Sequence, residues 1–355
     1  MNVRPSHAYL SPRHNGQHGF AKLLLVMVML AAVLCLGAYM LLQRWLEQPV
    51  HQESAAIRFE VAKGASMSEV AYQLAQQSGY GTPQLLTLFA RYRGAATRIR
   101  AGEYDIPPQA TPAEFLEVLV AGKVVSYPLT IIEGWTFQQM FSAIEQHAAL
   151  TKTITAAGDV MARLGRPDEH PEGRFYPDTY LVTKGQSDVE LLEQAYQRMS
   201  SELATAWAAR QEELPLKSPY EALILASIIE KETSVDDERE QIAGVFIRRL
   251  QKGMRLQTDP TVIYGIGASY DGNITRAHLR QDTPYNTYTR GGLTPTPIAL
   301  PGRRSLQAAV NPAAGSSLYF VATGTGDGRH YFSQSLAEHN RAVSRYLANQ
   351  RRGNR

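Results

Sequence analysis

Apolar residues follow one another from Leu23 to Leu42, and no charged or strongly polar side chain interrupts the run. The run has about the 20 residues that a helix needs to cross the hydrocarbon core of a bilayer. We therefore predict a transmembrane helix over residues 23–42. A cleaved signal peptide is the alternative, but its apolar region usually has roughly 7 to 15 residues, and residues 43–46 contain no small-residue cleavage site.

The charges on the two sides of this run differ. Residues 1–22 carry Arg4, Arg13 and Lys22 and no acidic residue, whereas Glu47 follows the run. Lysine and arginine mark the side of a membrane helix that stays inside. We predict that residues 1–22 form a cytoplasmic tail and that everything after the helix is extracytoplasmic. The chain would then be a single-pass protein of the cytoplasmic (inner) membrane.

Alternating strands and capped helices follow over residues 57–126, in the order strand, turn and apolar helix, twice. Ser66 with Glu69, and Thr111 with Glu114, have the spacing of capping boxes at the two helix starts. This arrangement resembles the LysM-type modules that bind glycans containing N-acetylglucosamine. We expect a small LysM-like α+β subdomain that binds glycan, with a generic α+β packing domain as the alternative.

The most strongly marked helix begins after Ser218, which has Pro219 at the first helical position and Glu221 three residues after the cap. Residues 222–229 are apolar on almost every face, so we predict a helix that is buried on all sides. Glu230 follows this apolar run directly. The pattern predicts an acidic side chain at the end of a core helix.

Water stabilises the charged form of a carboxyl group. A carboxyl group that is partly buried therefore keeps its proton more readily, and a proton donor in catalysis must hold a proton to give. Glu230 lies four residues after Ala226 and so continues the buried face, whereas Glu232 faces another side. Glu230 is therefore the candidate acid. The alternative from position alone is that Glu230 and Glu232 are both solvated acids at a helix end.

Two later segments, residues 255–265 and 285–288, are dense in amides, hydroxyls, carboxylates and phenols. Such groups in loops can bind sugar hydroxyl and N-acetyl groups, and aromatic rings can pack on the apolar face of a sugar. Taken singly, each tyrosine can be a packing residue, and the acid before Pro260 can begin a turn. Together they are candidate substrate-binding residues: Gln257, Asp259, Tyr264, Tyr285, Asn286 and Tyr288.

The remaining segments complete the predicted organisation. Residues 43–56 are short and polar, which indicates a stalk, and residues 127–347 are the expected larger mixed α/β catalytic domain. Within it, residues 171–180 form a loop rich in proline, glycine and aromatic residues that can build a site, and Asp178 is a further candidate binding residue. Residues 348–355 form a basic tail. The fold class is α+β.

Composition excludes several other functions. The 355 residues are 44% apolar and 19% charged, so the chain folds, and its formal charge of +3 is spread without the basic, aromatic groove that a nucleic acid needs. A single cysteine allows no intrachain disulfide. The histidines, such as His278, His330 and His339, show no paired ligand spacing, so we expect no metal and no cofactor.

Five motifs stand out along the chain: residues 226–233, residues 255–264, residues 285–288, Glu172-Gly173 with residues 177–180, and Gly292-Leu293 to Pro301-Gly302. Together they look like the signature motifs of the endolytic murein transglycosylase family, the MltG/YceG-like proteins. The likeness extends over the whole chain, anchor included. One departure is Thr294, where the family usually has proline, and it affects the shape of that loop.

The resemblance implies a peptidoglycan lytic transglycosylase, a carbon–oxygen lyase that cleaves the MurNAc-β-1,4-GlcNAc bond within nascent strands. The products end in 1,6-anhydro-MurNAc, and the cuts limit strand length during synthesis. The catalytic glutamate of the family matches Glu230, which would act as both acid and base. The implied partners are glycan strands, the cytoplasmic membrane and, from location, the peptidoglycan synthases.

Two other functions compete with this one. A hydrolase would need a second carboxylate at a defined separation from Glu230, and Asp259, Asp178 and Glu232 are the candidates that the sequence offers. A non-catalytic, anchored glycan-binding or division-scaffold protein would keep its effect without Glu230. The ends of the cleaved strands and a Glu230→Gln variant distinguish these functions.

Overall fold

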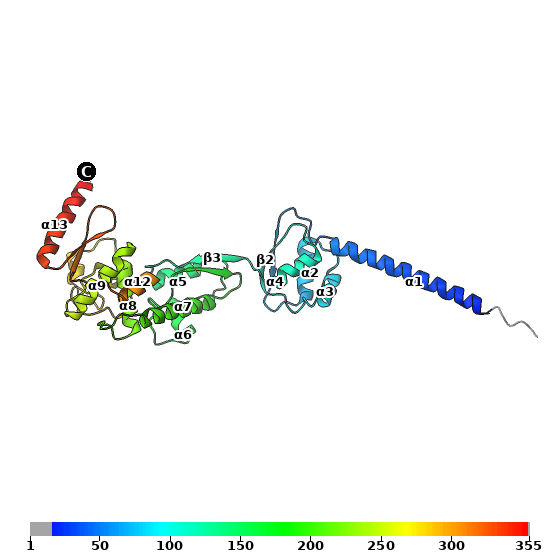
Figure 1. The fold of residues 1–355 in the computed structure, drawn as a ribbon, viewed down its shortest axis with the longest axis horizontal. Coiled ribbons are helices and arrows are strands. Elements are labelled where there is room, and N and C mark those ends of the chain that lie inside the picture. Colours follow the sequence, from blue (N-terminus) through cyan, green and yellow to red (C-terminus); the bar gives the residue numbers. More distant parts are fainter. Residues whose placement is uncertain (1–15, 354–355) are drawn as a thin grey trace, which may run out of the picture. The chain divides into compact units, whose positions relative to one another are not determined.

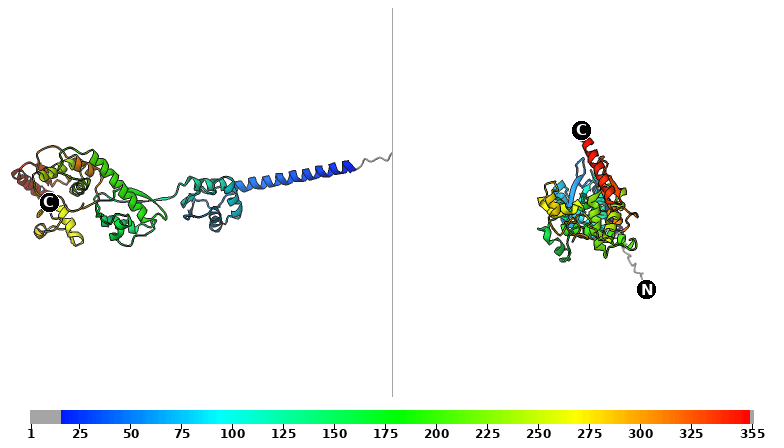
Figure 2. Two further views of the ribbon diagram at one scale, coloured as in Figure 1. Left: turned by 90° about the horizontal axis from the view of Figure 1, so that it is seen from below. Right: turned by 90° about the vertical axis from the view of Figure 1, so that its left-hand side faces the viewer.

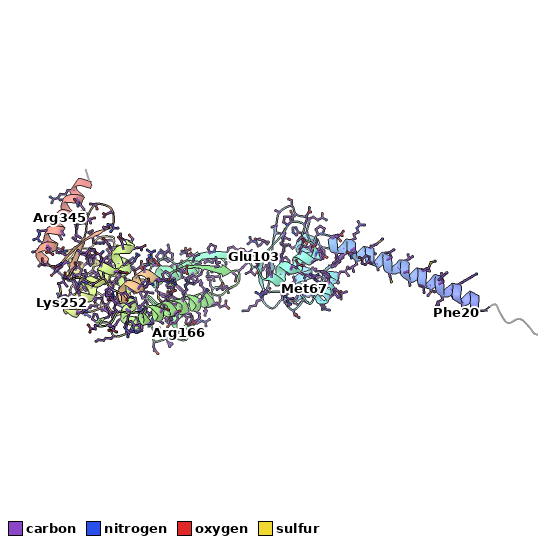
Figure 3. The ribbon with its side chains drawn as sticks, viewed as in Figure 1. Phe20, Met67, Glu103, Arg166, Lys252 and Arg345 are labelled. Carbon is purple, nitrogen blue, oxygen red and sulfur yellow. The ribbon has the colours of Figure 1, made fainter. Side chains whose placement is uncertain are left out.

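The computed structural model describes residues 16–353, and its contacts divide the chain into two units, residues 1–125 and 126–355. Helix α1 (Gly16–Glu47) begins the first unit and projects from it as a single straight helix (Figure 2, left). Of the tail predicted over residues 1–22, residues 1–15 lie outside the described residues, and the rest belongs to α1. Within α1, Lys22–Glu47 is long and apolar enough to cross a membrane. Its apolar side chains are exposed in every direction, as Figure 3 shows for Phe20 near its start.

The first unit continues with strands β1 (Ile57–Val61) and β2 (Gly102–Ile106), which pair antiparallel with Phe59 opposite Tyr104. Helices α2 (Met67–Ser78) and α3 (Pro83–Tyr92) connect the strands, and α4 (Pro112–Ala121) follows them (Figure 1). Both predicted capping boxes are present, at Ser66 and Thr111. The predicted strands and helices α2 and α4 are confirmed, and α3 is an additional helix. The likeness to LysM modules stays a prediction.

Residues 43–56, predicted to be a stalk, instead pack on this unit. Trp45 and Val50 are buried in its core, and the indole N–H of Trp45 donates to Thr82 Oγ1 at 2.7 Å. The backbone N–H of Val50 donates to the carbonyl of Ala110 at 2.7 Å, and the buried ring of His51 meets the carbonyl of Pro107 at 2.6 Å. The segment is polar on average, but its few apolar side chains gain free energy when they leave water.

The second unit has two small antiparallel sheets. Strands β3 (Ser126–Thr130) and β4 (Thr179–Thr183) form the first, and β5 (Tyr319–Ala322) and β6 (His330–Ser333) form the second. Between β3 and β4 lie α5 (Phe137–Gln146), the short 3-10 turn η1 (Ala157–Asp159) and α6 (Val160–Arg163). The other elements are α7 (Asp188–Ala208), α8 (Pro219–Glu232), η2 (Asp236–Glu238), α9 (Arg239–Gln251), α10 (Asp259–Ile266), η3 (Gly267–Ser269), α11 (Arg276–Arg280), α12 (Arg303–Val310) and α13 (Leu336–Gly353).

The core of this unit surrounds α8. Every residue from Ala222 to Ile229 is buried, and α7, α9 and α12 pack against the helix (Figure 1). A second hydrophobic cluster joins the β3–β4 sheet to α5 and the first half of α7. The described residues therefore form a mixed α/β structure in which the predicted all-round buried helix is central.

One local prediction was wrong. Residues 259–266, predicted to lie in a loop, form α10, because Pro260 starts a helix where we expected a turn. Residues 348–353 of the predicted basic tail belong to α13, and the last two residues lie outside the described part of the chain.

Candidate active site

Helix α8 carries Glu230 to the edge of the core. The hydroxyl of Ser218 accepts a hydrogen bond from the backbone N–H of Glu221 and so fixes the start of the helix. Three turns later Glu230 emerges with only 6% of its side chain exposed. The carboxylate is therefore held at the boundary between the core and a cavity.

Both oxygens of this carboxylate have partners. The backbone N–H of Gly302 donates to Oε2 at 3.0 Å, and Nη2 of Arg239 lies 3.5 Å from Oε1. Arg239 is buried, and its Nε donates to Ser305 Oγ at 3.2 Å while another nitrogen pairs with Asp236. These contacts come from η2, α9 and the start of α12, so the orientation of Glu230 depends on packing between distant parts of the chain.

A second acid, Glu133, lies beside Glu230, and the sequence alone did not identify it. It follows β3 in a loop that Leu300 holds, since the N–H of Gly134 donates to the carbonyl of Leu300 at 2.9 Å and the N–H of Leu300 donates to the carbonyl of Trp135 at 2.7 Å. Burial raises the pKa of Glu133, and the nearby charge of Glu230 raises it further. The site therefore contains a pair of interacting carboxyl groups.

Gly302 lies between these two carboxyl groups. A Cβ atom added to Gly302 would overlap the carboxylate of Glu133, while the N–H of the same residue is bonded to Glu230. Glycine thus lets the backbone approach both acids without displacing the carboxylate of Glu133. The residue belonged to a motif in the sequence, but no local signal placed it between two acids.

A cavity of about 400 Å³ opens on this pair of acids. Lys231 lies at its edge, where Nζ donates to the carbonyl of Gly134 at 3.1 Å. The lining is polar and includes three carboxyl groups, two cations and two hydroxyls. The lining residues are Glu133, Gly134, Glu230, Lys231, Glu232, Thr233, Ser234 and Arg239.

A second cavity of about 480 Å³ lies next to the end of α8, and Glu232 lines both cavities. Among the predicted binding residues, Gln257, Asp259 and Tyr288 line this second cavity. The phenol of Tyr288 donates to Asp259 Oδ1 at 2.6 Å. The hydroxyl of Thr258 donates to Glu232, whose pKa burial raises to about 7.

Tyr264 and Tyr285 line neither of these cavities, and their rings contact each other with centroids 4.9 Å apart. The phenol of Tyr264 donates to Glu172 Oε2 at 3.0 Å, and that of Tyr285 shares a 2.9 Å hydrogen bond with Thr296. Glu172 is buried and also accepts from the N–H of Phe137 at 2.8 Å. Burial raises its pKa to about 7.

The two other predicted residues, Asn286 and Asp178, bond to other parts of the protein. Asn286 is 1% exposed, and its amide donates to the backbone carbonyls of His278, Leu279 and Gln281. Asp178 forms a 3.0 Å ion pair with Arg198 and does not line either cavity. In these positions the first side chain shapes the loop that presents Tyr288, and the second joins β4 to α7.

The described residues contain no group of three His, Cys, Asp or Glu side chains that could hold a metal ion. His330, one of the scattered histidines, has Nδ1 2.8 Å from Glu238 Oε2. Thr294, the departure from the family pattern, is buried, and its hydroxyl donates to the carbonyl of Thr296 at 2.8 Å. This hydrogen bond connects two residues of the same loop.

Residues 59–345 match the family model described as the YceG-like family. The endolytic murein transglycosylase of Bacillus subtilis (strain 168) is 29% identical over 335 residues, which cover 89% of this chain and 92% of that protein. The endolytic murein transglycosylase of Streptococcus pneumoniae serotype 2 (strain D39 / NCTC 7466) is 25% identical over 325 residues, or 81% of this chain and 58% of that protein.

The structure is also similar to a solved one. The 2.6 Å crystal structure of a YceG-like protein from Listeria monocytogenes matches with a TM-score of 0.53 and 29% identity. The match covers 81% of this chain and 99% of that one.

Proposed function

The chain belongs to the YceG-like family, and from this premise we propose that it is an anchored endolytic murein transglycosylase with Glu230 as its acid and base. Two relatives named endolytic murein transglycosylases support the activity, and the Bacillus subtilis one matches over nearly its whole length. One observation carries the assignment of the site. Glu230 ends a buried helix and faces a polar cavity with its carboxylate held from two sides.

The proposed reaction needs one proton relay. Protonated Glu230 donates its proton to the glycosidic oxygen between MurNAc and GlcNAc, and the bond from that oxygen to C1 of MurNAc breaks. The C6 hydroxyl of the same MurNAc attacks C1, and Glu230, now a carboxylate, takes the hydroxyl proton. The products are a 1,6-anhydro-MurNAc end and a GlcNAc end with a free 4-hydroxyl. The nucleophile belongs to the substrate, so water takes no part.

Glu133 supplies negative charge beside the reacting carbon in this proposal. The transition state resembles an oxocarbenium ion, and an ionised carboxylate nearby stabilises its positive charge. Burial raises the pKa of Glu133, and the nearby charge of Glu230 raises it further. Arg239 and Gly302 hold Glu230 in position rather than reacting themselves.

The second cavity provides the binding groups. Tyr288, Asp259 and Gln257 would hold the hydroxyl and N-acetyl groups of the strand. They line the second cavity, and Glu232 lines both this cavity and the one that contains Glu230. Tyr264, Tyr285, Asn286 and Asp178 support these residues from behind in this proposal. The residues that the sequence grouped together are thus divided into those that bind and those that position.

Helix α1 is the proposed anchor. Its length and apolar composition suit a single-pass helix of the inner membrane, and the positive charges of the predicted tail favour a cytoplasmic N-terminus. The catalytic unit would then act on strands outside the membrane, beside the synthases that extrude them, and would limit strand length. Residues 57–126 would bind glycan as a LysM-like subdomain.

A retaining hydrolase is the second candidate, because Glu133 places a second carboxylate beside Glu230. Of the acids that the sequence offered for this role, Glu232 lines the reaction cavity, whereas Asp259 and Asp178 do not. A hydrolase would leave reducing ends, and a transglycosylase leaves anhydro ends. The mass of the strand ends therefore distinguishes the two.

The experiment that tests the proposed function compares two matched variants on purified glycan strands. Glu230→Gln should reduce cleavage to the uncatalysed background, since the amide neither donates nor accepts the required proton. Glu240→Gln, on the exposed side of α9, should cleave like the unmodified protein. Equal cleavage by both variants would remove Glu230 from the mechanism, and a chain without any cleavage would favour a glycan-binding protein.

A further inference from the structure

Helix α3 has apolar side chains on two of its faces. Pro83, Leu86 and Ala90 point into the core of the first unit. Leu85, Leu88, Phe89 and Tyr92 follow the spacing of a second stripe, one helical turn apart, on the outer side. Leu85 is 46% exposed, Leu88 62% and Tyr92 87%. A surface helix of a soluble domain usually has polar residues on that side, so this stripe needs a partner.

The outer stripe meets the end of the proposed anchor. Leu42 and Leu46 of α1 join Leu85, Leu88 and Tyr92 of α3 around a cavity of about 420 Å³, with Trp45 and Phe89 as its other lining residues. The lining is almost wholly apolar. The stripe is thus continuous with the apolar surface of the helix proposed to cross the bilayer.

Trp45 fixes α1 and α3 to each other. Its ring meets that of Phe89 edge to face at 5.6 Å, and its N–H donates to Thr82, the N-cap residue of α3. Because these contacts are buried, α3 cannot turn its outer stripe away from the end of α1 without exposing Trp45. The depth of Leu42 in a bilayer therefore sets the depth of the stripe.

The residues around the stripe suit the surface of a bilayer. Tyr92 and Trp45 are amphipathic aromatic residues, which gather where hydrocarbon meets headgroups. Arg44, in the last turn of α1, and the exposed Arg91, near the end of α3, add cationic groups that attract anionic headgroups. Arg93 lies over the ring of Phe89, 5.8 Å from its centroid.

We propose that the outer stripe of α3 inserts into the outer interface of the same bilayer that α1 crosses. The inference rests on the anchoring part of the proposed function. The continuity of the stripe with α1 favours lipid over a soluble partner, because the stripe begins where the membrane-spanning stretch ends. α3 then lies on the membrane as an interfacial helix and fixes the orientation of the first unit against it.

The test places probes in the full-length protein reconstituted into vesicles of zwitterionic and anionic phospholipids. In a Cys35→Ser background, a single cysteine at Leu88 carries an environment-sensitive fluorophore, and brominated lipids report contact with acyl chains. Val33→Cys, in α1, is the control for insertion of the anchor, and Gln76→Cys, exposed on α2, is the control for water. All three positions are exposed, so labelling does not disturb the core.

Bromolipid should quench the Leu88 probe to an extent that approaches the Val33 probe and should leave the Gln76 probe unaffected. A Leu88 probe in water beside a quenched Val33 probe would overturn the inference and leave the anchor intact. A Leu88 probe that is shielded from water but not quenched would also overturn it, in favour of a protein occupant such as a second copy. If the Val33 probe is not quenched, the anchor itself fails, and the inference fails with it.

Discussion

The backbone N–H of Gly302 donates to Oε2 of Glu230 at 3.0 Å. This one bond joins the end of the buried helix α8 to the residue that precedes α12, and it fixes one of the two carboxylate oxygens. The other side of Gly302 lies against Glu133, with no room for a side chain. A side chain at position 302 would therefore displace the carboxylate of Glu133.

Gly302→Ala should lower both the rate of cleavage and the stability of the fold. The added methyl group must displace Glu133 or the bond to Glu230, and misplacing a catalytic group by about 1 Å can cost on the order of 100-fold in rate. The expected loss of unfolding free energy is about 1–3 kcal/mol. Steady-state cleavage and chemical denaturation of the same sample measure both effects. Unchanged cleavage by a folded Gly302→Ala protein would contradict this account of the site.

Glu133→Gln should slow cleavage without abolishing it. In the unmodified protein the rate should rise with pH as Glu133 ionises, at a higher pH than an ordinary glutamate because burial and Glu230 raise its pKa. The variant lacks the charge that stabilises the transition state, so we expect a rate at least about 10-fold lower and no such rise. The pH dependence of kcat measures this, and a variant with the unmodified profile would exclude Glu133 from the reaction.

Two tyrosines that look alike in the sequence should behave differently. Tyr288→Phe loses the phenol that meets Asp259 in the second cavity, so KM should rise several-fold, by about 1 kcal/mol of binding, with little change in kcat. Tyr264→Phe loses a hydrogen bond to the buried Glu172, so unfolding free energy should fall by about 1–3 kcal/mol with KM unchanged. A raised KM for Tyr264→Phe and a lowered unfolding free energy for Tyr288→Phe would instead make Tyr264 the binding residue and Tyr288 the structural one.

Glu172 should make the second unit less stable as pH rises. Burial raises the pKa of Glu172 to about 7, so the folded state holds its proton where the unfolded state has released it. Its contribution is therefore complete below about pH 4 and is lost as pH rises through about 7, by at most about 3 kcal/mol.

Glu172→Gln removes this titration and keeps an acceptor for the N–H of Phe137. Between about pH 5 and about pH 8 its unfolding free energy should fall less than that of the unmodified protein. Denaturation of the full chain in detergent, followed by tryptophan fluorescence in a Trp45→Phe background so that only Trp135 and Trp207 report, measures the difference. Equal pH dependence in both proteins would show that Glu172 ionises normally.

Local signals predicted most of the elements that carry the site. The caps at Ser66, Thr111 and Ser218 and the apolar run of residues 222–229 are patterns over a few neighbouring residues, and the structure has helices at all of them. Helix α3 has no such signal, because its apolar residues face both the core and the outside, and no side chain caps its start.

The pairing of Glu133 with Glu230 could not be predicted in this way. It depends on contacts between the loop after β3, the end of α8 and the start of α12, which are far apart along the chain. The sequence offered Asp259, Asp178 and Glu232 as second acids because they stood within recognisable motifs. Residues 43–56 show the same limit, since average polarity concealed the burial of Val50 and His51.

The most direct test of the central claim is cleavage of glycan strands in water enriched in oxygen-18, with mass spectrometry of the new ends. If the C6 hydroxyl of MurNAc is the nucleophile and Glu230 serves as acid and base, every new MurNAc end is an anhydro end without the heavy isotope. Glu230→Gln should produce no such ends, and Glu240→Gln should produce them normally. New reducing ends that carry oxygen-18 would contradict the account and identify a hydrolase.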